Sequence, residues 1–412
     1  MVNLKSIFII GAIGVISALN ACDTSSGKQV STEQNRVVQN AEVVNIAIDQ
    51  YERMLRETDK SQINPRTVEK GKTRATNSGF DWTEGFFPGS CWYLYELTKD
   101  VKWKEAAERY QEKFAGHRFI KTNHDLGFVF GCSYGNGLRL TGNKEYMPVL
   151  IDAGNSLITR FNEEVGCIQS WDVDKGWQSK RGWSFPVIID NMMNLEMLFE
   201  LSRLTGDEKY KEIAIRHANT TLANHFRPDN SSYHVIDYDS TTGKVRKKET
   251  AQGFSHESVW ARGQAWGLYG YTLCYKYTQD PAYLDQAKKI AAFIRHHPLV
   301  PEDHVPYWDY LAPRKPNEPR DASAAAITAS ALIQLSDYAG EAYLHQAIGI
   351  MNSLSSDSYL AKAGENHNFL LKHSTGSIPH GVEIDVPINY ADYYFLEALV
   401  RLNDRGIALK TD

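Results

Sequence analysis

The sequence lacks several features that define common protein classes. Its 412 residues carry 45 Lys and Arg against 50 Asp and Glu, so there is no basic excess with which to coat a nucleic acid. Only five cysteines occur, without the CxxC or HxxxH spacing of a zinc site, and their spacing does not require a disulfide. We therefore expect no nucleic-acid partner and no metal.

Long hydrophobic runs are also absent after the first 22 residues, because no later run reaches the roughly 20 apolar residues of a membrane helix. The first 22 residues have a positive end at Lys5, an apolar run and a Leu-Asn-Ala-Cys motif ending at Cys22. This pattern is typical of a bacterial lipoprotein signal, with an ordinary cleaved signal peptide as the alternative. We expect Cys22 to be lipidated, residues 23–33 to be a tether, and residues 34–412 to form one domain held at the cell envelope, periplasmic or surface-facing.

A recurring helical unit is what the rest of the sequence does contain. A nearly all-apolar segment ends in a short turn, and an amphipathic segment with a charged face follows. The turn reads Leu-Thr-Gly-Asp at 204–207, with close variants at 97–100, 140–143, 277–280 and 338–341. Self-similarity at intervals of about 40 to 75 residues indicates a helical repeat architecture.

The pattern predicts six inner and six outer helices, and hence an all-α fold, an (α/α)6 six-hairpin barrel. The inner helices are expected at 87–97, 128–140, 190–204, 260–277, 322–338 and 390–402, and the outer ones at 37–56, 101–115, 144–161, 208–223, 281–296 and 341–354. An open solenoid is the alternative. It would need polar capping repeats at its ends, and the sequence shows no obvious one, which favours closure. The long connections fall between each outer helix and the next inner one, and residues 233–250 read as a hairpin on that side.

Acidic and aromatic residues gather at the starts of the inner helices, which a closed barrel brings to one mouth. Asp125 and Asp190 begin neighbouring inner helices, and an acid in apolar company is either an N-cap or a group with a raised pKa. Two such acids across a dry mouth cannot both ionise cheaply, so one would stay protonated, as a general acid must. Three further acids read as structural: Asp321 as an N-cap, Asp392 as a loop anchor and Glu84 as the partner of a Lys or Arg.

Three motifs in order resemble the unsaturated glucuronyl hydrolases, glycoside hydrolase family 88. They are His-Asp-Leu-Gly-Phe at 124–128, Ile-Ile-Asp-Asn-Met-Met-Asn at 188–194 and Trp-Ala-Arg-Gly-Gln-Ala-Trp at 260–266. The resemblance runs from about residue 81 onward and implies an (α/α)6 barrel without a cofactor. It also implies a glycosidase that hydrates the 4,5-double bond of a non-reducing-end unsaturated uronic acid and so releases it from the neighbouring sugar.

The resemblance also implies roles for individual residues. Asp190 matches the general acid and base, and Asp125 its partner carboxylate. The substrate-binding set would be Trp82, His124, Trp171, His234, Gln252, Trp260, Arg262, Trp266, Ser374 and Ser377. Trp177 or Trp183 could stand in place of Trp171, since the loop there varies in length. Arg262 could offer a bidentate fork to a uronate carboxylate or pair with one of the two acids.

Two other functions fit the same residues. One is an unsaturated rhamnogalacturonyl hydrolase, which shares the fold and the reaction, and the other is a lipid-anchored sugar-binding protein without activity. The 22 Tyr and 9 Trp suit any sugar cleft, or simply a large core. We expect a substrate of glycosaminoglycan type, made by a polysaccharide lyase that acts first, and contact with a membrane only through the anchor.

Overall fold

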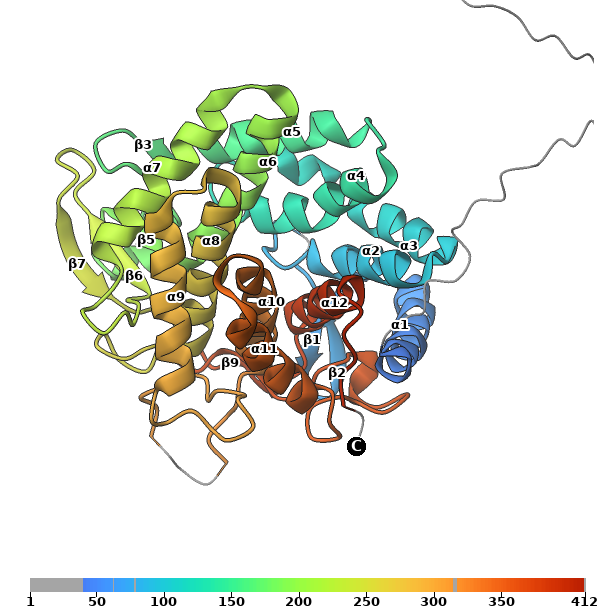
Figure 1. The fold of residues 1–412 in the computed structure, drawn as a ribbon. Helices are drawn as coiled ribbons and strands as arrows, with labels where there is room; N and C mark the ends of the chain where they lie inside the picture. The colour runs from blue at the N-terminus through green and yellow to red at the C-terminus, as the bar shows by residue number, and fades with distance from the viewer. Residues whose placement is uncertain (1–39, 62, 78, 314–316, 411–412) are drawn as a thin grey trace, which may run out of the picture. The chain divides into compact units, whose positions relative to one another are not determined.

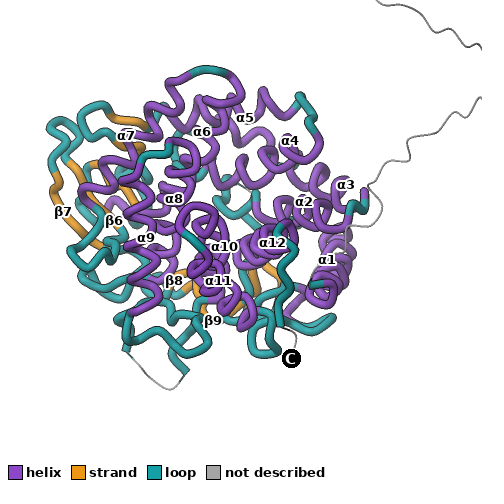
Figure 2. Tube along the Cα trace, viewed as in Figure 1, coloured by secondary structure: helices purple, strands orange, loops and turns teal. Residues whose placement is uncertain are grey.

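Helices dominate the part of the chain that the computed structural model describes, which is residues 40–61, 63–77, 79–313 and 317–410 (Figure 2). The outer helices are α1 (Ala41–Ser61), α3 (Val101–Glu112), α5 (Tyr146–Ile158), α7 (Glu208–Asn224), α9 (Pro281–His296) and α11 (Glu341–Leu354). The inner helices are α2 (Phe86–Thr98), the π-helix η2 (Gly127–Gly135) continued by α4 (Asn136–Thr141), α6 (Leu195–Thr205), α8 (Ala261–Thr278), α10 (Ala322–Ala339) and α12 (Asn389–Asp404).

The inner helices form a closed ring. Each contacts the next in the order α2, η2, α6, α8, α10 and α12, and α12 then packs against α2, so elements from opposite ends of the described chain lie side by side (Figure 1). Closure confirms the barrel and excludes the open solenoid. The helix limits match the expected ones closely at α9 and α11, whereas the expected helix 128–140 is divided between η2 and α4.

The composition of the inner helices explains why they are buried on all sides. In α10, every residue from Ala322 to Ile333 is buried, and most of them are Ala or Ser. Small side chains let α10 pack closely against α8, α11 and α12. The outer helix α9, in contrast, buries one face that includes Ala287, Ile290 and Ile294 and exposes charges on the other. These two patterns are those of an inner and an outer layer.

The recurring turn between layers has a repeated hydrogen-bond design. In the turn after α6, the Thr205 hydroxyl donates to the Leu201 carbonyl, Gly206 takes a left-handed conformation, and the Asp207 carboxylate accepts the Lys209 N–H as the N-cap of α7. The same roles recur in Thr98-Lys99-Asp100 and Thr278-Gln279-Asp280. The turn therefore ends one helix and begins the next, which is why it marks the repeat in the sequence.

Short strands lie on the side of the barrel where the inner helices begin. The predicted hairpin at 233–250 is present as β6 (Val235–Tyr238) and β7 (Val245–Glu249), and β5 (Phe185–Ile188) adds a third antiparallel strand. The hairpins of β1 (Pro65–Glu69) with β2 (Lys72–Ala75), β3 (Phe161–Asn162) with β4 (Cys167–Ile168), and β8 (Ser374–Ser377) with β9 (Val382–Val386) were not predicted.

The predicted signal segment with Cys22 and the tether at 23–33 lie outside the described residues. Within the described ranges, no helix combines the length and the apolar character needed to cross a membrane. The cysteines of these ranges, Cys91, Cys132, Cys167 and Cys274, are buried free thiols.

Candidate active site

A pocket of about 340 Å³ opens where the inner helices begin. Four of the predicted site residues line it: Trp82, Gln252, Arg262 and Ser377. The other lining residues are Arg66, Trp177, Gly376, His380, Val382, Glu383 and Tyr390. The pocket therefore combines aromatic faces with charged and polar groups, as sugar-binding sites do.

Asp190 lies in a short 3₁₀ helix, η4 (Ile189–Asn194), between strand β5 and helix α6. The sequence placed it at the start of the α-helix itself, but a 3₁₀ turn at a helix N-terminus is common. Asp190 is 8% exposed, and its Oδ2 has no hydrogen-bond partner. Burial raises its pKa to about 7, against an opposing effect of the Arg262 guanidinium. Asp190 is therefore an acid of which about half is protonated in neutral solution.

Asp125 is the second buried acid of the site, with 7% of its surface exposed. Burial raises its pKa well above the usual range, and the nearby Asp190 carboxylate raises it further, while Arg160 acts in the opposite direction. The electrostatic effect of Asp190 on Asp125 means that the two acids predicted as a pair do lie close together. Such a pair holds at least one proton near neutral pH.

The two acid-bearing segments meet because one residue between them has no side chain. A Cβ on Gly127 would lie 2.4 Å from the Asn194 Cα, so only glycine permits this approach of η2 to η4. The Asn194 side chain then accepts a hydrogen bond from the Phe128 N–H at 3.1 Å. Close backbone packing thus fixes the relative positions of Asp125 and Asp190.

Two buried histidines point a nitrogen at these acids. His234 Nδ1 accepts hydrogen bonds from the backbone N–H groups of Ala251 and Gln252, so the ring proton sits on Nε2, which lies 3.6 Å from Asp190 Oδ2. His124 Nε2 lies 3.3 Å from Asp125 Oδ1. Burial lowers the pKa of His124 to about 3 and that of His234 well below 6.5, so both rings are neutral donors at pH 7.

Arg262 is fully buried and uses most of its hydrogen-bonding groups inside the protein. Its Nη1 donates to Asp321 Oδ2 at 2.7 Å and to the Thr375 carbonyl, and its Nη2 donates to the Gly376 carbonyl. Only Nε has no partner. The guanidinium pairs with neither Asp125 nor Asp190, and both of its Nη atoms are engaged within the protein, which leaves Nε for a ligand.

The predicted tryptophans divide into two groups. Trp82 is half-buried in the pocket wall, 5.0 Å from the Tyr390 ring, whereas Trp266 is buried and packs on Phe128 below the pocket. Trp260 is buried under Arg262. On the other side, Trp171 contacts His234, Trp177 and Trp183, and of these three tryptophans Trp177 is the one that lines the pocket.

The β8–β9 hairpin forms another wall and carries the two predicted serines. The Ser377 hydroxyl pairs with His380 Nδ1 at 2.7 Å at the pocket, whereas Ser374 is fully buried with an unpaired hydroxyl outside the pocket lining. Arg66 of β1 holds the hairpin by donating to Glu383 and at the same time to Asp81, just before Trp82. This ion triad joins three walls of the pocket.

Unpaired polar atoms are concentrated around this site. Seven buried atoms without a partner belong to it: His124 Nε2, Asp190 Oδ2, His234 Nε2, Arg262 Nε, Trp266 Nε1, Ser374 Oγ and Tyr390 Oη. Buried polar atoms in folded proteins are nearly always hydrogen-bonded, so such a cluster indicates a place for a polar ligand or water. Across the described residues, no three His, Cys, Asp or Glu side chains converge in the manner of a metal site.

The three acids expected to be structural do serve the fold. Asp321 caps α10 by accepting from the Ser323 and Ala324 N–H groups, and Asp392 anchors a loop by accepting from Leu370 and Leu371. Glu84 differs from expectation, because its partner is His117 at 2.7 Å and not a Lys or Arg. Burial raises the pKa of Glu84 to about 9, so a neutral carboxyl needs no cationic partner.

Comparison with known proteins assigns the chain to a family. The sequence profile described as Glycosyl Hydrolase Family 88 matches residues 53–405. The chain belongs to this family. It is 45% identical over 379 residues to the unsaturated glucuronyl hydrolase of Formosa agariphila, and the alignment covers 91% of this chain and 90% of that relative. It is 33% identical over 330 residues to the unsaturated chondroitin disaccharide hydrolase of Streptococcus agalactiae, with coverage of 78% and 81%.

Solved structures of family 88 proteins share the fold. The crystal structure of an unsaturated glucuronyl hydrolase specific for heparin is similar to this one with a TM-score of 0.84 at 47% identity. The alignment covers 90% of this chain and 98% of that chain. The described barrel is therefore the family 88 fold over nearly its whole length.

Several residues of this family 88 pocket were not in the predicted set. Arg66, His380 and Glu383 were missed because nothing local in the sequence marks them, although His380 follows Ser377 by only three residues. Tyr390 could have been included, since it begins the last inner helix as the other candidates begin theirs.

The contact at Gly127 generates a test. We expect Gly127→Ala to lower kcat at least 10-fold and to cost about 1–3 kcal/mol of unfolding free energy, because the new methyl group forces η2 and η4 apart. Gly131→Ala is the matched control on the same helix, since its Cβ would meet only Met197 Cβ at 3.9 Å. Steady-state kinetics and urea denaturation of both variants measure these effects, and equal behaviour of the two would contradict the packing argument.

Proposed function

We propose that this protein is an unsaturated glucuronyl hydrolase, which hydrates the 4,5-double bond of the unsaturated uronic acid at the non-reducing end of lyase-generated oligosaccharides. The observation that carries the proposal is the buried pair of Asp190 and Asp125, in which Asp190 has a pKa of about 7. Protonating an alkene carbon requires a carboxylic acid that is neutral near physiological pH and shielded from water. Membership of family 88 supports the same reaction.

The proposed reaction begins with transfer of the Asp190 proton to C4 of the enol ether. The double-bond electrons form the new C4–H bond, and the positive charge at C5 is shared with the ring oxygen. A water molecule adds to C5 and returns a proton to Asp190, which restores the acid. The resulting hemiketal opens and expels the neighbouring sugar, so the reaction consumes one water and no other reagent.

The neighbouring side chains have separate parts in this scheme. The neutral His234 presents its Nε2 proton on the Asp190 side, where it stabilises the carboxylate left after proton transfer. Asp125 shares with Asp190 the proton and the negative charge of the pair. Trp82 and Tyr390 present ring faces suited to a sugar, and Ser377 with His380 meets the sugar that departs.

A disaccharide of glycosaminoglycan type is the substrate that we propose. The similar proteins act on glucuronyl, chondroitin and heparin substrates by their names, which supports this class over pectin products. A protein that only binds sugar is the weaker reading, because crowding two buried acids costs stability and gives a binding site nothing in return. A polysaccharide lyase would have to act first, since only an eliminative cleavage leaves the 4,5-double bond.

Replacement of the acid is the first test. We expect Asp190→Asn to lower turnover to below a few percent of wild type, because the amide cannot donate the proton to C4. The assay follows the loss of the unsaturated uronate absorbance with unsaturated chondroitin, heparin and pectin disaccharides. Asp392→Asn is the matched control, since it removes another buried acid with a pKa of about 7 that lies outside the site. Residual activity above a few percent in Asp190→Asn removes this residue from the role of acid.

The pH dependence of the rate follows from the raised pKa of Asp190. The protonated form is the active one, so kcat should be highest below about pH 7 and fall above it, approaching tenfold per pH unit. We expect kcat to fall because Asp190 loses its proton and not because the protein unfolds. Circular dichroism over the same pH range checks that the fold is kept. A kcat that stays level to pH 9 would rule out a titrating acid with this pKa.

We propose further that the mature protein is a lipoprotein of the bacterial envelope. The motif ending at Cys22 and the polar stretch that follows support this location. Cys22→Ala should abolish incorporation of a clickable fatty acid during growth and release the protein from the membrane pellet. Full labelling of Cys22→Ala would place the lipid elsewhere, and absence of label in wild type would favour an ordinary cleaved signal.

A further inference from the structure

A second and larger cavity, about 630 Å³, lies inside the same barrel and is separate from the active site. It is lined by the later turns of the inner helices, for example by Tyr269 and Tyr277 of α8 and by Tyr394 and Arg401 of α12. On α8, Arg262 marks the active pocket and Tyr277 the cavity, and 15 residues of α-helix span about 22 Å. The cavity therefore extends along the barrel away from the active pocket.

The cavity exists partly because one helix carries glycines at several positions of its wall. Gly127, Gly131 and Gly135 of the π-helix η2 all line it, and a Cβ on Gly131 would meet only Met197 Cβ, at 3.9 Å. A side chain at Gly131 would thus grow into open space. Segments of π-helix occur frequently at functional sites, and this one joins the acid Asp125 to the cavity wall.

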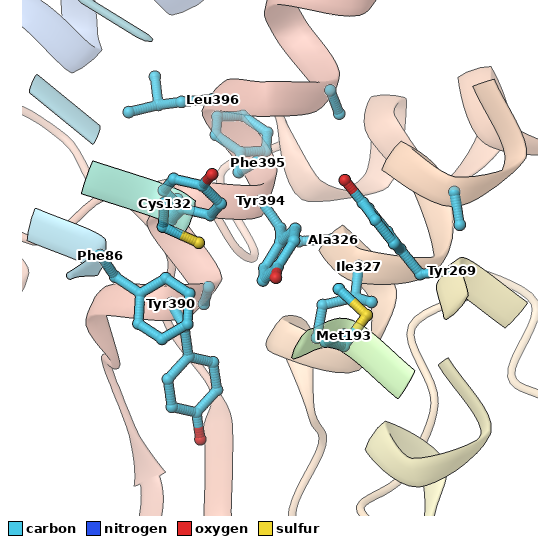
Figure 3. Close-up of a cluster of buried hydrophobic side chains, with 14 of the residues drawn as sticks. Phe86, Cys132, Met193, Tyr269, Ala326, Ile327, Tyr390, Tyr394, Phe395 and Leu396 are labelled. Atoms are coloured by element: carbon cyan, nitrogen blue, oxygen red, sulfur yellow. The ribbon is translucent and has the colours of Figure 1, made fainter. Parts of the chain in front are cut away.

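Aromatic rings and sulfur atoms form much of the cavity wall. Figure 3 shows Tyr394 projecting between Cys132 on one side and Tyr269 and Met193 on the other. The Tyr93 and Tyr269 hydroxyls are fixed by hydrogen bonds to the buried carboxylate of Glu397, which also accepts from Ser330. The walls are therefore pre-organised and present mainly ring faces and apolar atoms.

Eight of the nine charged side chains in the described lining of this cavity are paired with one another. The pairs are Arg139 with Glu96, Arg203 with Glu200, Lys276 with Glu196 and Arg401 with Glu397. A charged ligand that used one of these groups would have to break its ion pair. An uncharged molecule with an apolar ring face meets no such cost.

We propose that this cavity is a second ligand site, which takes an uncharged sugar or glycoside, distinct from the anionic uronate that the active pocket would hold. Its volume is within the range of small-molecule sites and suits a ligand of one or two rings. Tyrosine faces stack on the apolar face of a pyranose, and the polar groups at the mouth suit its hydroxyls.

Two residues of the cavity wall connect it with the packing around the active site. Phe128 and Met193 line it, and each is the third residue after one of the two acids, Asp125 and Asp190. Phe128 also contacts Trp82 and Trp266 at ring-centroid distances of 5.5 and 5.1 Å. A ligand in the cavity would therefore press on the same packing that positions the acids.

The test uses 4-iodophenyl β-D-glucopyranoside as the probe. We expect saturable binding to the wild-type protein with a Kd below about 1 mM, measured by isothermal titration calorimetry. Crystals soaked in the probe should show the iodine, by its anomalous signal, among Tyr394, Met193 and Tyr269. Iodine only in the pocket beside Trp82, or no saturable binding, overturns the proposal.

Two substitutions at one position supply the matched comparison. Gly131→Phe fills the middle of the cavity and should weaken probe binding at least 10-fold, whereas Gly131→Ala should leave it within about 3-fold. Circular dichroism and thermal melting establish that each variant is folded. Undiminished binding by a folded Gly131→Phe protein contradicts the proposal, and if this variant does not fold, the iodine position in the wild-type crystal decides. The outcome does not depend on the hydrolase activity, which is assayed separately.

Discussion

The burial of two carboxyl groups near enough to affect each other's charge is the constraint on which this site depends. Asp125 and Asp190 are each less than a tenth exposed, and the charge of one raises the pKa of the other. An arrangement of this kind costs stability, so the surroundings must hold it in place. They do so through backbone packing, because Gly127 lets η2 approach Asn194 of η4 closely. The closed ring of inner helices then prevents the two segments from separating.

The fold was predictable because its signals are local and repeated. Three of the layer changes use the same turn chemistry, with a Thr hydroxyl, a left-handed residue and an Asp N-cap within four residues, as in Thr205-Gly206-Asp207. The burial pattern is equally local, since α10 is buried at every position from Ala322 to Ile333 and mostly small there, while α9 is apolar on one face. Ring closure then follows from six such hairpins. The positions of Asp125 and Asp190 at the same mouth follow from closure.

The rest of the pocket could not be predicted, because it depends on contacts between segments far apart in the sequence. Arg66 pairs with Glu383, which is 317 residues away in the sequence, and with Asp81, which is 15 residues away. No local pattern in β1 or β9 predicts these pairs. Glu383 also has a left-handed backbone, which is unfavourable for a residue other than glycine and is compensated here by the ion pair. Strain of this kind is read from coordinates and not from composition. The same holds for the choice of Trp177 over Trp171 as the residue that lines the pocket.

Arg262 shows how the structure resolves a conflict that the sequence leaves open. A buried guanidinium beside the acids would keep Asp190 ionised and oppose its role, yet the pKa of Asp190 is raised to about 7. The reason is that Asp321 lies 2.7 Å from the guanidinium and balances its charge, while the Thr375 and Gly376 carbonyls take up its remaining Nη donors. The dominant influence on Asp190 is then burial. Because Arg262 also holds the β8 backbone, its charge serves to fix the pocket wall, and its Nε, which has no partner, is the guanidinium nitrogen left to meet a ligand in the pocket.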